Sequence, residues 1–155
     1  MKSKMHRHLL THSVVIKASR THVWNSLTDW QSQSSWMAMT SVRSISREEP
    51  IGTEIFALTG LFARRNFWLK KYLGILDHMI VTQWSPPHSC EVDHVGKIIK
   101  GIGRFSLVEV TDNSTRFDWY EEILAPKLLM LILRPGIMLG VRFSLWRFTR
   151  SFRNE

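Results

Sequence analysis

The sequence predicts an α+β domain in which a curved antiparallel sheet of seven strands surrounds a long C-terminal helix. Three observations lead to this fold class. Two short helical segments directly follow the first strand-like segment, six further strand-like segments are joined by turns, and one long amphipathic segment ends the chain. Strands joined by short turns run antiparallel, and a helix with one apolar face needs a concave apolar surface to cover it.

A single domain accounts for the whole chain, 1–155. With 155 residues, 44% of them hydrophobic, the chain can bury one core, and no linker, repeat or low-complexity tract divides it. Residues 1–7 are expected to form a flexible end, and no apolar run follows them that could serve as a signal peptide. Arg134, Pro135 and Arg142 interrupt the longest apolar stretch, 128–146, so we expect a core-facing helix there, no membrane span, and a cytoplasmic protein.

The opening segments alternate between strand and helix. The β-branched centre of 8–18 predicts the first strand. Ser19 can cap a helix over 21–27, and Asp29 can cap a second helix that ends at Trp36. Turn-forming Pro, Gly, Asn and Asp residues separate the six strands that follow, which are expected over 40–48, 53–59, 76–84, 88–98, 101–110 and 115–123.

The final segment has the clearest helical pattern. Pro126 suits the first turn of a helix that continues towards Phe152. Pro135 is expected to kink or divide this helix, and the spacing of Gly136 and Gly140 to reflect close packing. Helical periodicity separates an expected core face from a solvated face, the first carrying Ile137, Met138, Val141, Leu145, Phe148 and Phe152 and the second Arg142, Arg147, Arg150 and Arg153.

Several motifs resemble those of a known family. Residues 16–24 followed by Leu27-Thr28-Asp29 resemble the strand-to-helix opening of the bacterial polyketide cyclase/dehydrase-like branch of the SRPBCC (START/Bet v 1-like) superfamily. Similar matches follow along the chain at Gly52-Thr53, 77–84 with Pro86-Pro87, His94-Val95-Gly96, 101–105 and 115–121. The resemblance implies the helix-grip fold and a cavity for a small hydrophobic ligand. Members of this superfamily bind or transform many apolar compounds, so it names no ligand.

Strand alternation selects the candidate polar site. Glu121 shares the expected inward face of its strand with Phe117 and Trp119, and His94 shares the inward face of its strand with Val92. If the hairpins keep this register, His94, Gly103 and Glu121 form one row across three strands. The imidazole and the carboxylate then meet over a residue that has no side chain.

The preferred function is binding of a small hydrophobic molecule, such as a lipid, polyketide or quinone-like compound, between the sheet and the last helix. Trp36 is expected near the entrance. No cofactor is expected. The predicted ligand-binding residues are Trp36, Val92, His94, Phe105, Phe117, Trp119, Glu121, Met138, Val141 and Leu145.

Two alternatives stay open. In the first, the protein is a cyclase or dehydratase-type enzyme in which His94 or Glu121 transfers a proton, although the sequence assigns no catalytic residue firmly. In the second, the protein carries a lipid or quinone at an anionic membrane surface. The net charge of +8 favours acidic partners, and the stretch 61–72 is unusually basic, with Arg64, Arg65, Lys70 and Lys71.

Other chemistries lack a motif. Cys90 is the only cysteine, so neither an intrachain disulfide nor a cysteine-rich metal site can form. His6, His8 and His12 lie near the predicted flexible end without an acidic companion, so no metal site is expected. No nucleic-acid-binding motif accompanies the positive charge, so nucleic acid is not an expected partner.

Overall fold

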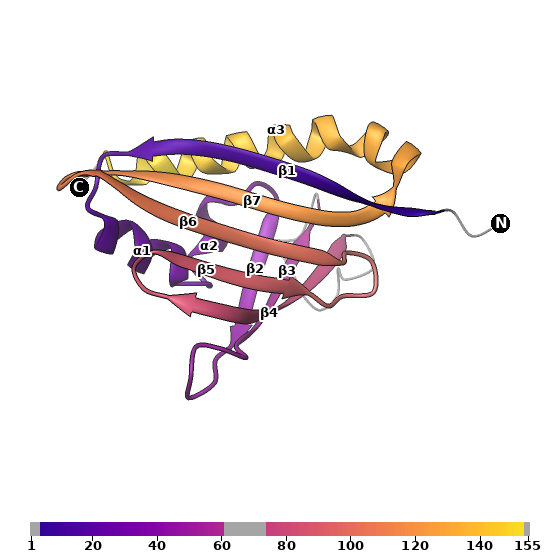
Figure 1. Cartoon of the computed structure of the whole chain (residues 1–155), viewed down its shortest axis with the longest axis horizontal. Coiled ribbons are helices and arrows are strands. Elements are labelled where there is room, and N and C mark those ends of the chain that lie inside the picture. Colours follow the sequence, from indigo (N-terminus) through magenta and orange to yellow (C-terminus); the bar gives the residue numbers. More distant parts are fainter. Residues whose placement is uncertain (1–3, 61–73, 154–155) are drawn as a thin grey trace.

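One seven-stranded sheet and three helices make up the computed structural model, which describes residues 4–60 and 74–153 (Figure 1). Neighbouring strands are all antiparallel, in the order β1-β7-β6-β5-β4-β3-β2. The predicted fold class is therefore confirmed. The strands are β1 (Met5–Ile16), β2 (Thr40–Ile45), β3 (Glu54–Thr59), β4 (Ile75–Ser85), β5 (Ser89–His94), β6 (Gly101–Thr111) and β7 (Ser114–Pro126).

Two short helices follow β1, as predicted. α1 (Arg20–Thr28) is capped by Ser19, whose hydroxyl accepts a hydrogen bond from the backbone N–H of His22. The prediction that Asp29 caps the second helix is wrong, because α2 (Gln33–Trp36) begins after Ser32. The Asp29 carboxylate instead accepts a hydrogen bond from the backbone N–H of Ser32, within the turn between the two helices.

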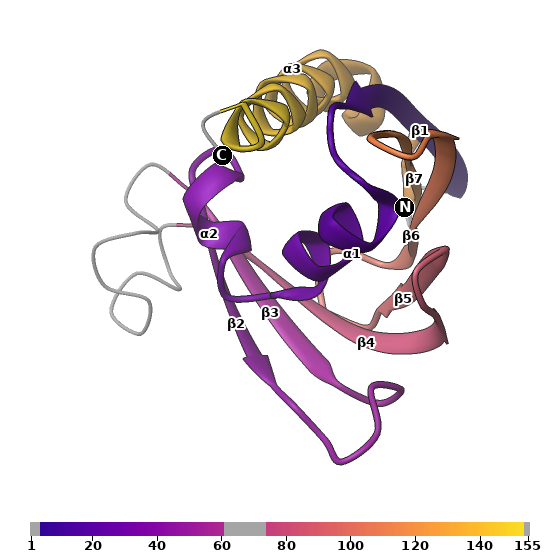
Figure 2. The ribbon, with the colours of Figure 1, turned by 90° about the vertical axis from the view of Figure 1, so that its left-hand side faces the viewer.

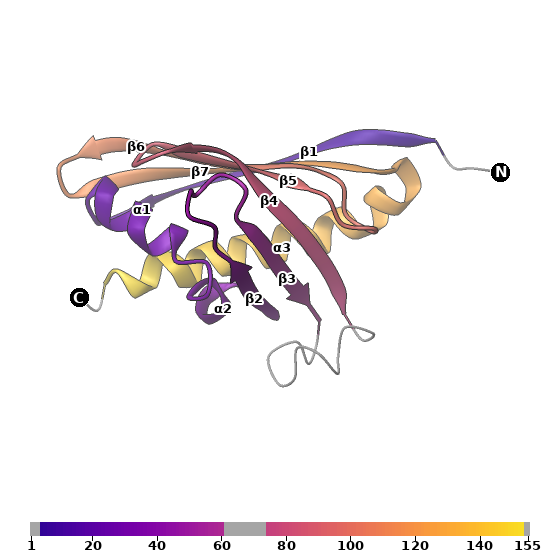
Figure 3. The ribbon, with the colours of Figure 1, turned by 90° about the horizontal axis from the view of Figure 1, so that it is seen from below.

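The sheet curves into an arc, and α3 (Lys127–Ser151) crosses its open side (Figures 2 and 3). α1 and α2 cover one end of the concave face. The hydrophobic core lies at this covered end, where Val23 and Leu27 of α1 pack with Phe117 of β7 and Phe148 of α3. All four side chains are almost fully buried, so this end is held by apolar packing.

β1 begins earlier than the sequence indicated. It pairs with β7 from Met5 to Ile16, so the prediction of a flexible end over residues 1–7 is wrong for residues 5–7. His6, His8 and His12 lie on the concave side of this strand, and Nε2 of His8 lies 3.1 Å from the carbonyl oxygen of Ala125. Backbone pairing along a long neighbouring strand orders this segment.

α3 packs against the domain through only part of its length. It is one continuous helix with Pro135 inside it, so the proline does not divide it. Met130, Ser144, Leu145 and Phe148 are its buried residues. The expectation that 128–146 faces the core is therefore wrong for the outer side of the helix, where several leucines lie in solvent.

The glycines of α3 do not mark a close contact. A Cβ atom placed on Gly136 or Gly140 would meet no described atom within 4 Å, so the predicted close packing at this pair is wrong. The helix is buried at Met130 near its start and again at Ser144, Leu145 and Phe148 in its C-terminal half, on either side of the two glycines. In that half, bulky Leu145 and Phe148 fill the space.

Candidate functional site

Three charged side chains meet on the concave face of the sheet. Nδ1 of His94, at the end of β5, lies 2.8 Å and 2.9 Å from the two carboxylate oxygens of Asp77 on β4. Nε2 of the same ring lies 2.7 Å from Oε1 of Glu121 on β7. The imidazole is therefore held between two carboxylates. We refer to Asp77, His94 and Glu121 as the buried triad.

The strand register brings the triad together diagonally. Gly103 pairs with Val92 on one side and with Glu121 on the other, whereas His94 pairs with Gly101. The predicted straight row of His94, Gly103 and Glu121 is thus wrong by two residues on the β5–β6 side. The connection between these strands is centred one residue earlier than the sequence interpretation assumed.

Gly103 nevertheless leaves the space that the prediction required. A Cβ atom at this position would lie 3.1 Å from Oε2 of Glu121 and 3.1 Å from Nε2 of His94. Contacts this short are tighter than side chains ordinarily tolerate, so a larger residue would push the two charged groups apart. Glycine at this position is what allows the imidazole and the carboxylate to meet.

Asp77 was missed from the sequence. It belongs to β4, where the strand register shifts between Val81 and Gln83, so alternation counted from the strand's end misassigns its faces. A usable signal is nevertheless present. Met79 is apolar and pairs with His94, and Asp77 lies two residues before it on the same face.

Burial and charge act in opposite directions on His94, whose side chain is only 2% exposed. Burial alone would lower its pKa, but the hydrogen bonds to Asp77, the 2.7 Å contact with Glu121 and the negative charges of both carboxylates outweigh burial and raise the pKa to about 10. The ring therefore carries a proton on both nitrogens at neutral pH. An imidazolium has no free lone pair, so His94 cannot act as a general base there.

Glu121 has the opposite character. Burial raises the pKa of its carboxyl group, with a further contribution from the negative charge of Asp77, while His94 opposes the rise. Its side chain keeps 15% of its exposure, so an oxygen remains accessible from the concave side. The contact between Nε2 of His94 and Glu121 is an ion pair without a well-aligned hydrogen bond in the described part of the chain.

The predicted ligand-binding residues fall into two groups. Phe117 and Leu145 are 2% and 3% exposed and belong to the core. Apart from the triad members His94 and Glu121, the other predicted residues are only partly buried. They lie on the concave face of the sheet, on the inner face of α3 or beside α2, and they are Trp36, Val92, Phe105, Trp119, Met138 and Val141.

Trp36 lines an opening at the end of the domain that α1 and α2 cover. This open pocket of about 430 Å³ is bordered by Trp36 and Phe148, whose ring centroids lie 4.7 Å apart. The rest of its lining is mostly polar and comprises His22, Asn25, Ser26, Asp29, Ser32, Ser35 and Ser151. The triad lies far from this opening, since Glu121 is six residues, or about 20 Å, along β7 from Thr115 at the covered end.

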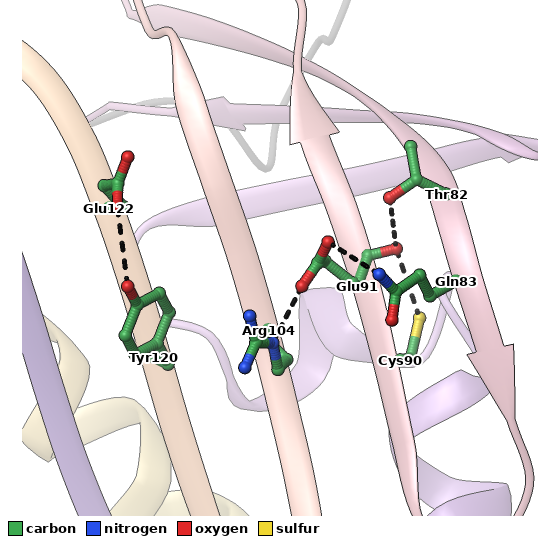
Figure 4. Close-up of polar contacts among 7 residues, drawn as sticks. All are labelled: Thr82, Gln83, Cys90, Glu91, Arg104, Tyr120 and Glu122. Atoms are coloured by element: carbon green, nitrogen blue, oxygen red, sulfur yellow. Dashed lines mark hydrogen bonds and ion pairs between the residues drawn. The ribbon is translucent and has the colours of Figure 1, made fainter.

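The convex face carries a separate polar network (Figure 4). Glu91 accepts hydrogen bonds from Arg104 at 2.8 Å and from Gln83 at 3.2 Å, and the hydroxyl of Tyr120 donates to Glu122. Arg104 is half exposed, so these contacts are surface interactions. The network offers a comparison for the buried triad, because the two lie on opposite faces of the same strands.

The remaining candidates for chemistry are inactive or absent. Burial raises the pKa of the Cys90 thiol to about 12, with a further contribution from the charge of Glu91, so it is not a nucleophile at neutral pH. Among the residues that the structure describes, no group of three or more His, Cys, Asp or Glu side chains could hold a metal ion. The basic residues Arg64, Arg65, Lys70 and Lys71 lie outside the described residues.

Comparisons with known proteins rest on structure. No family model matches the sequence, and no curated protein matches it either. Among solved structures, the ZhuI aromatase/cyclase from Streptomyces sp. R1128 superposes with a TM-score of 0.76 at 11% identity, over 96% of this chain and 94% of that one.

Two further solved structures superpose on most of this chain. A START superfamily protein from Mycobacterium smegmatis has a TM-score of 0.71 at 12% identity, over 93% of this chain and 98% of that one. A protein from Thermus thermophilus has a TM-score of 0.73 at 11% identity, over 95% and 98%. Together with the strand order and the position of α3, these matches show that the chain has the START/Bet v 1-like helix-grip fold, which the aromatase/cyclase from Streptomyces shares.

Proposed function

We propose that this protein binds a small apolar molecule between the concave face of the sheet and α3. The observation that carries the proposal is the incomplete burial of Val92, Phe105 and Trp119. These side chains point towards the concave side, next to the core, yet they retain accessible surface. Apolar surface that faces inward without being covered can be covered by an apolar ligand.

The buried triad supplies the polar end of this proposed site. The side chain of Glu121 keeps 15% of its exposure, and burial raises its pKa, which favours the protonated form. In that form the carboxyl group can donate a hydrogen bond to a carbonyl or hydroxyl oxygen on an otherwise apolar body. Lipids, polyketides and quinone-like compounds share that chemistry, and the fold neighbours, an aromatase/cyclase among them, support the same class by analogy. The START-like fold also supports a soluble protein, for which we propose the cytoplasm.

Replacement of Trp119 by alanine is expected to weaken binding of an apolar fluorescent probe, anilinonaphthalene sulfonate, at least tenfold. Loss of a large aromatic contact on the ligand side costs more than about 1.4 kcal/mol, which corresponds to a factor of ten. Tyr120→Ala is the matched control, because Tyr120 follows Trp119 on β7 and its side chain lies on the convex face, where its hydroxyl donates to Glu122 (Figure 4). Fluorescence titration of both variants and of the wild type provides the measurement. Equal affinity in all three would remove the concave face as the site.

The enzymatic alternative has one observation in its favour. Glu121 combines a pKa that burial raises with partial exposure on the concave side, as a general acid requires, whereas His94 is held protonated. In a cyclase or dehydratase-type reaction, Glu121 would move the proton and His94 would position it, with Asp77 holding the ring.

Glu121→Gln separates catalysis from binding. If the protein dehydrates its ligand, the variant is expected to co-purify with a compound heavier by one water than the compound in the wild type, because the amide cannot transfer the proton. Native mass spectrometry of both freshly purified proteins measures this difference. The same ligand mass in both preparations would exclude dehydration of the bound compound.

A further inference from the structure

We propose that the outer face of α3 docks onto an anionic membrane surface. The surface concerned is formed by Leu128, Ile132, Leu139, Phe143 and Trp146, which we call the outer stripe. At about 100° per residue these side chains fall within about 60° of one another, along roughly 27 Å of helix. They lie opposite the buried Met130 and Phe148. This surface is separate from the proposed ligand site, and neither proposal depends on the other.

The outer stripe is unusually exposed for its composition. Leu128, Ile132 and Leu139 keep between 67% and 71% of their surface, and no described element lies over them (Figure 2). By length and composition α3 could even cross a membrane, and only 17% of its most apolar stretch is buried. A continuous apolar surface of this kind on a soluble fold marks an interaction site.

The charges beside the outer stripe select an anionic surface. α3 contains no Asp or Glu, and at about 100° per residue Arg142, Arg147 and Arg150 lie within about 70° of the centre of the outer stripe, whereas Lys127 and Arg134 fall towards the opposite side of the helix. The guanidinium of Arg150 lies 4.9 Å from the ring centre of Trp146, and the rings of Trp146 and Phe143 stack at 5.7 Å. Aromatic rings and arginines together are the side chains that occupy the headgroup level of a bilayer.

Two other arrangements fit less well. A spanning helix would have to leave the domain, but Met130, Leu145 and Phe148 are packed against it, so the helix must lie in the plane of the surface. In a symmetric dimer through the same face, arginines of both copies would approach each other without any acidic partner on either helix. An anionic lipid surface can cover the outer stripe with its apolar chains and pair its headgroups with the arginines at the same time.

Vesicle flotation tests the proposal. The wild type is expected to float with phosphatidylcholine vesicles that contain phosphatidylglycerol, and the double variant Ile132→Asn with Leu139→Asn to bind them at least tenfold more weakly. Ile98→Asn is the matched control, because Ile98 and Ile132 are both 67% exposed. It is expected to bind within twofold of the wild type. Both variants alter solvent-exposed side chains, so thermal melting should show unchanged stability.

Three results would overturn the proposal. The first is that the wild type fails to bind the anionic vesicles, and the second is that Ile98→Asn loses as much binding as the double variant. The third is that light scattering shows a dimer for the wild type and a monomer for the double variant, while both bind the vesicles equally. An independent measurement uses Leu139→Cys labelled with an environment-sensitive dye. Cys90 does not compete for the label because it is buried with a raised pKa. Dye emission is expected to shift to the blue on anionic vesicles only.

Discussion

Replacement of His94 by leucine is expected to lower the free energy of unfolding by about 3–5 kcal/mol at neutral pH. Leucine fills much of the same space but leaves Asp77 and Glu121 buried near each other without the imidazolium between them. Removing one partner of a buried ion pair costs about this much, since the remaining charges lose their compensation in a medium of low dielectric constant. Equilibrium unfolding in guanidinium chloride measures the loss.

Two comparisons identify the cause of this loss. Arg104→Leu breaks the 2.8 Å pair with Glu91 on the convex face, where Arg104 is half exposed, and should cost less than about 1 kcal/mol. In a protein that already carries Asp77→Asn and Glu121→Gln, the cost of His94→Leu should shrink markedly, because no carboxylate is left uncompensated. The same cost in both backgrounds would mean that packing, and not charge, makes His94 important.

The free energy of unfolding of the wild type is expected to fall as the pH rises from about 6.5 towards about 10. In His94→Gln, the part of this fall that is due to His94 should be absent. The triad raises the pKa of His94 from 6.5 to about 10 in the folded state, despite burial that acts against the proton. The folded protein therefore holds this proton more tightly than the unfolded chain. That contribution is complete below pH 6.5 and is lost as the pH approaches 10.

Glu121 adds a contribution of the same sign at lower pH. Burial raises its pKa above the usual 4.5, so its contribution to stability is also lost with rising pH, beginning near pH 4.5. Unfolding curves at several pH values measure both contributions. The difference between wild type and His94→Gln reports the loss of the imidazolium together with the change that this loss makes to the titration of Glu121. Parallel curves across the range from 6.5 to 10 would show that the ring is not held protonated.

Much of the site could be predicted because strand alternation depends on local sequence. The apolar neighbours Phe117 and Trp119 place Glu121 on the inward face, and Val92 does the same for His94. Asp77 could not be placed in this way, because the register shift in β4 breaks the alternation between it and the strand's end. The row of His94, Gly103 and Glu121 was misplaced because the exact centre of a six-residue connection is not encoded in its flanking pattern.

Turn signals and local periodicity in the sequence were enough to predict an antiparallel sheet around a C-terminal helix, the inward faces of β5 and β7 and the two-sided character of α3, and the family resemblance implied the helix-grip fold. The tertiary structure, in contrast, determines which charges meet, since the triad joins three strands through a register set by distant contacts. It also decided how far α3 is covered. Periodicity identifies the helix's apolar positions, but burial depends on which face of the helix the sheet covers, and the outer stripe lies on the opposite face.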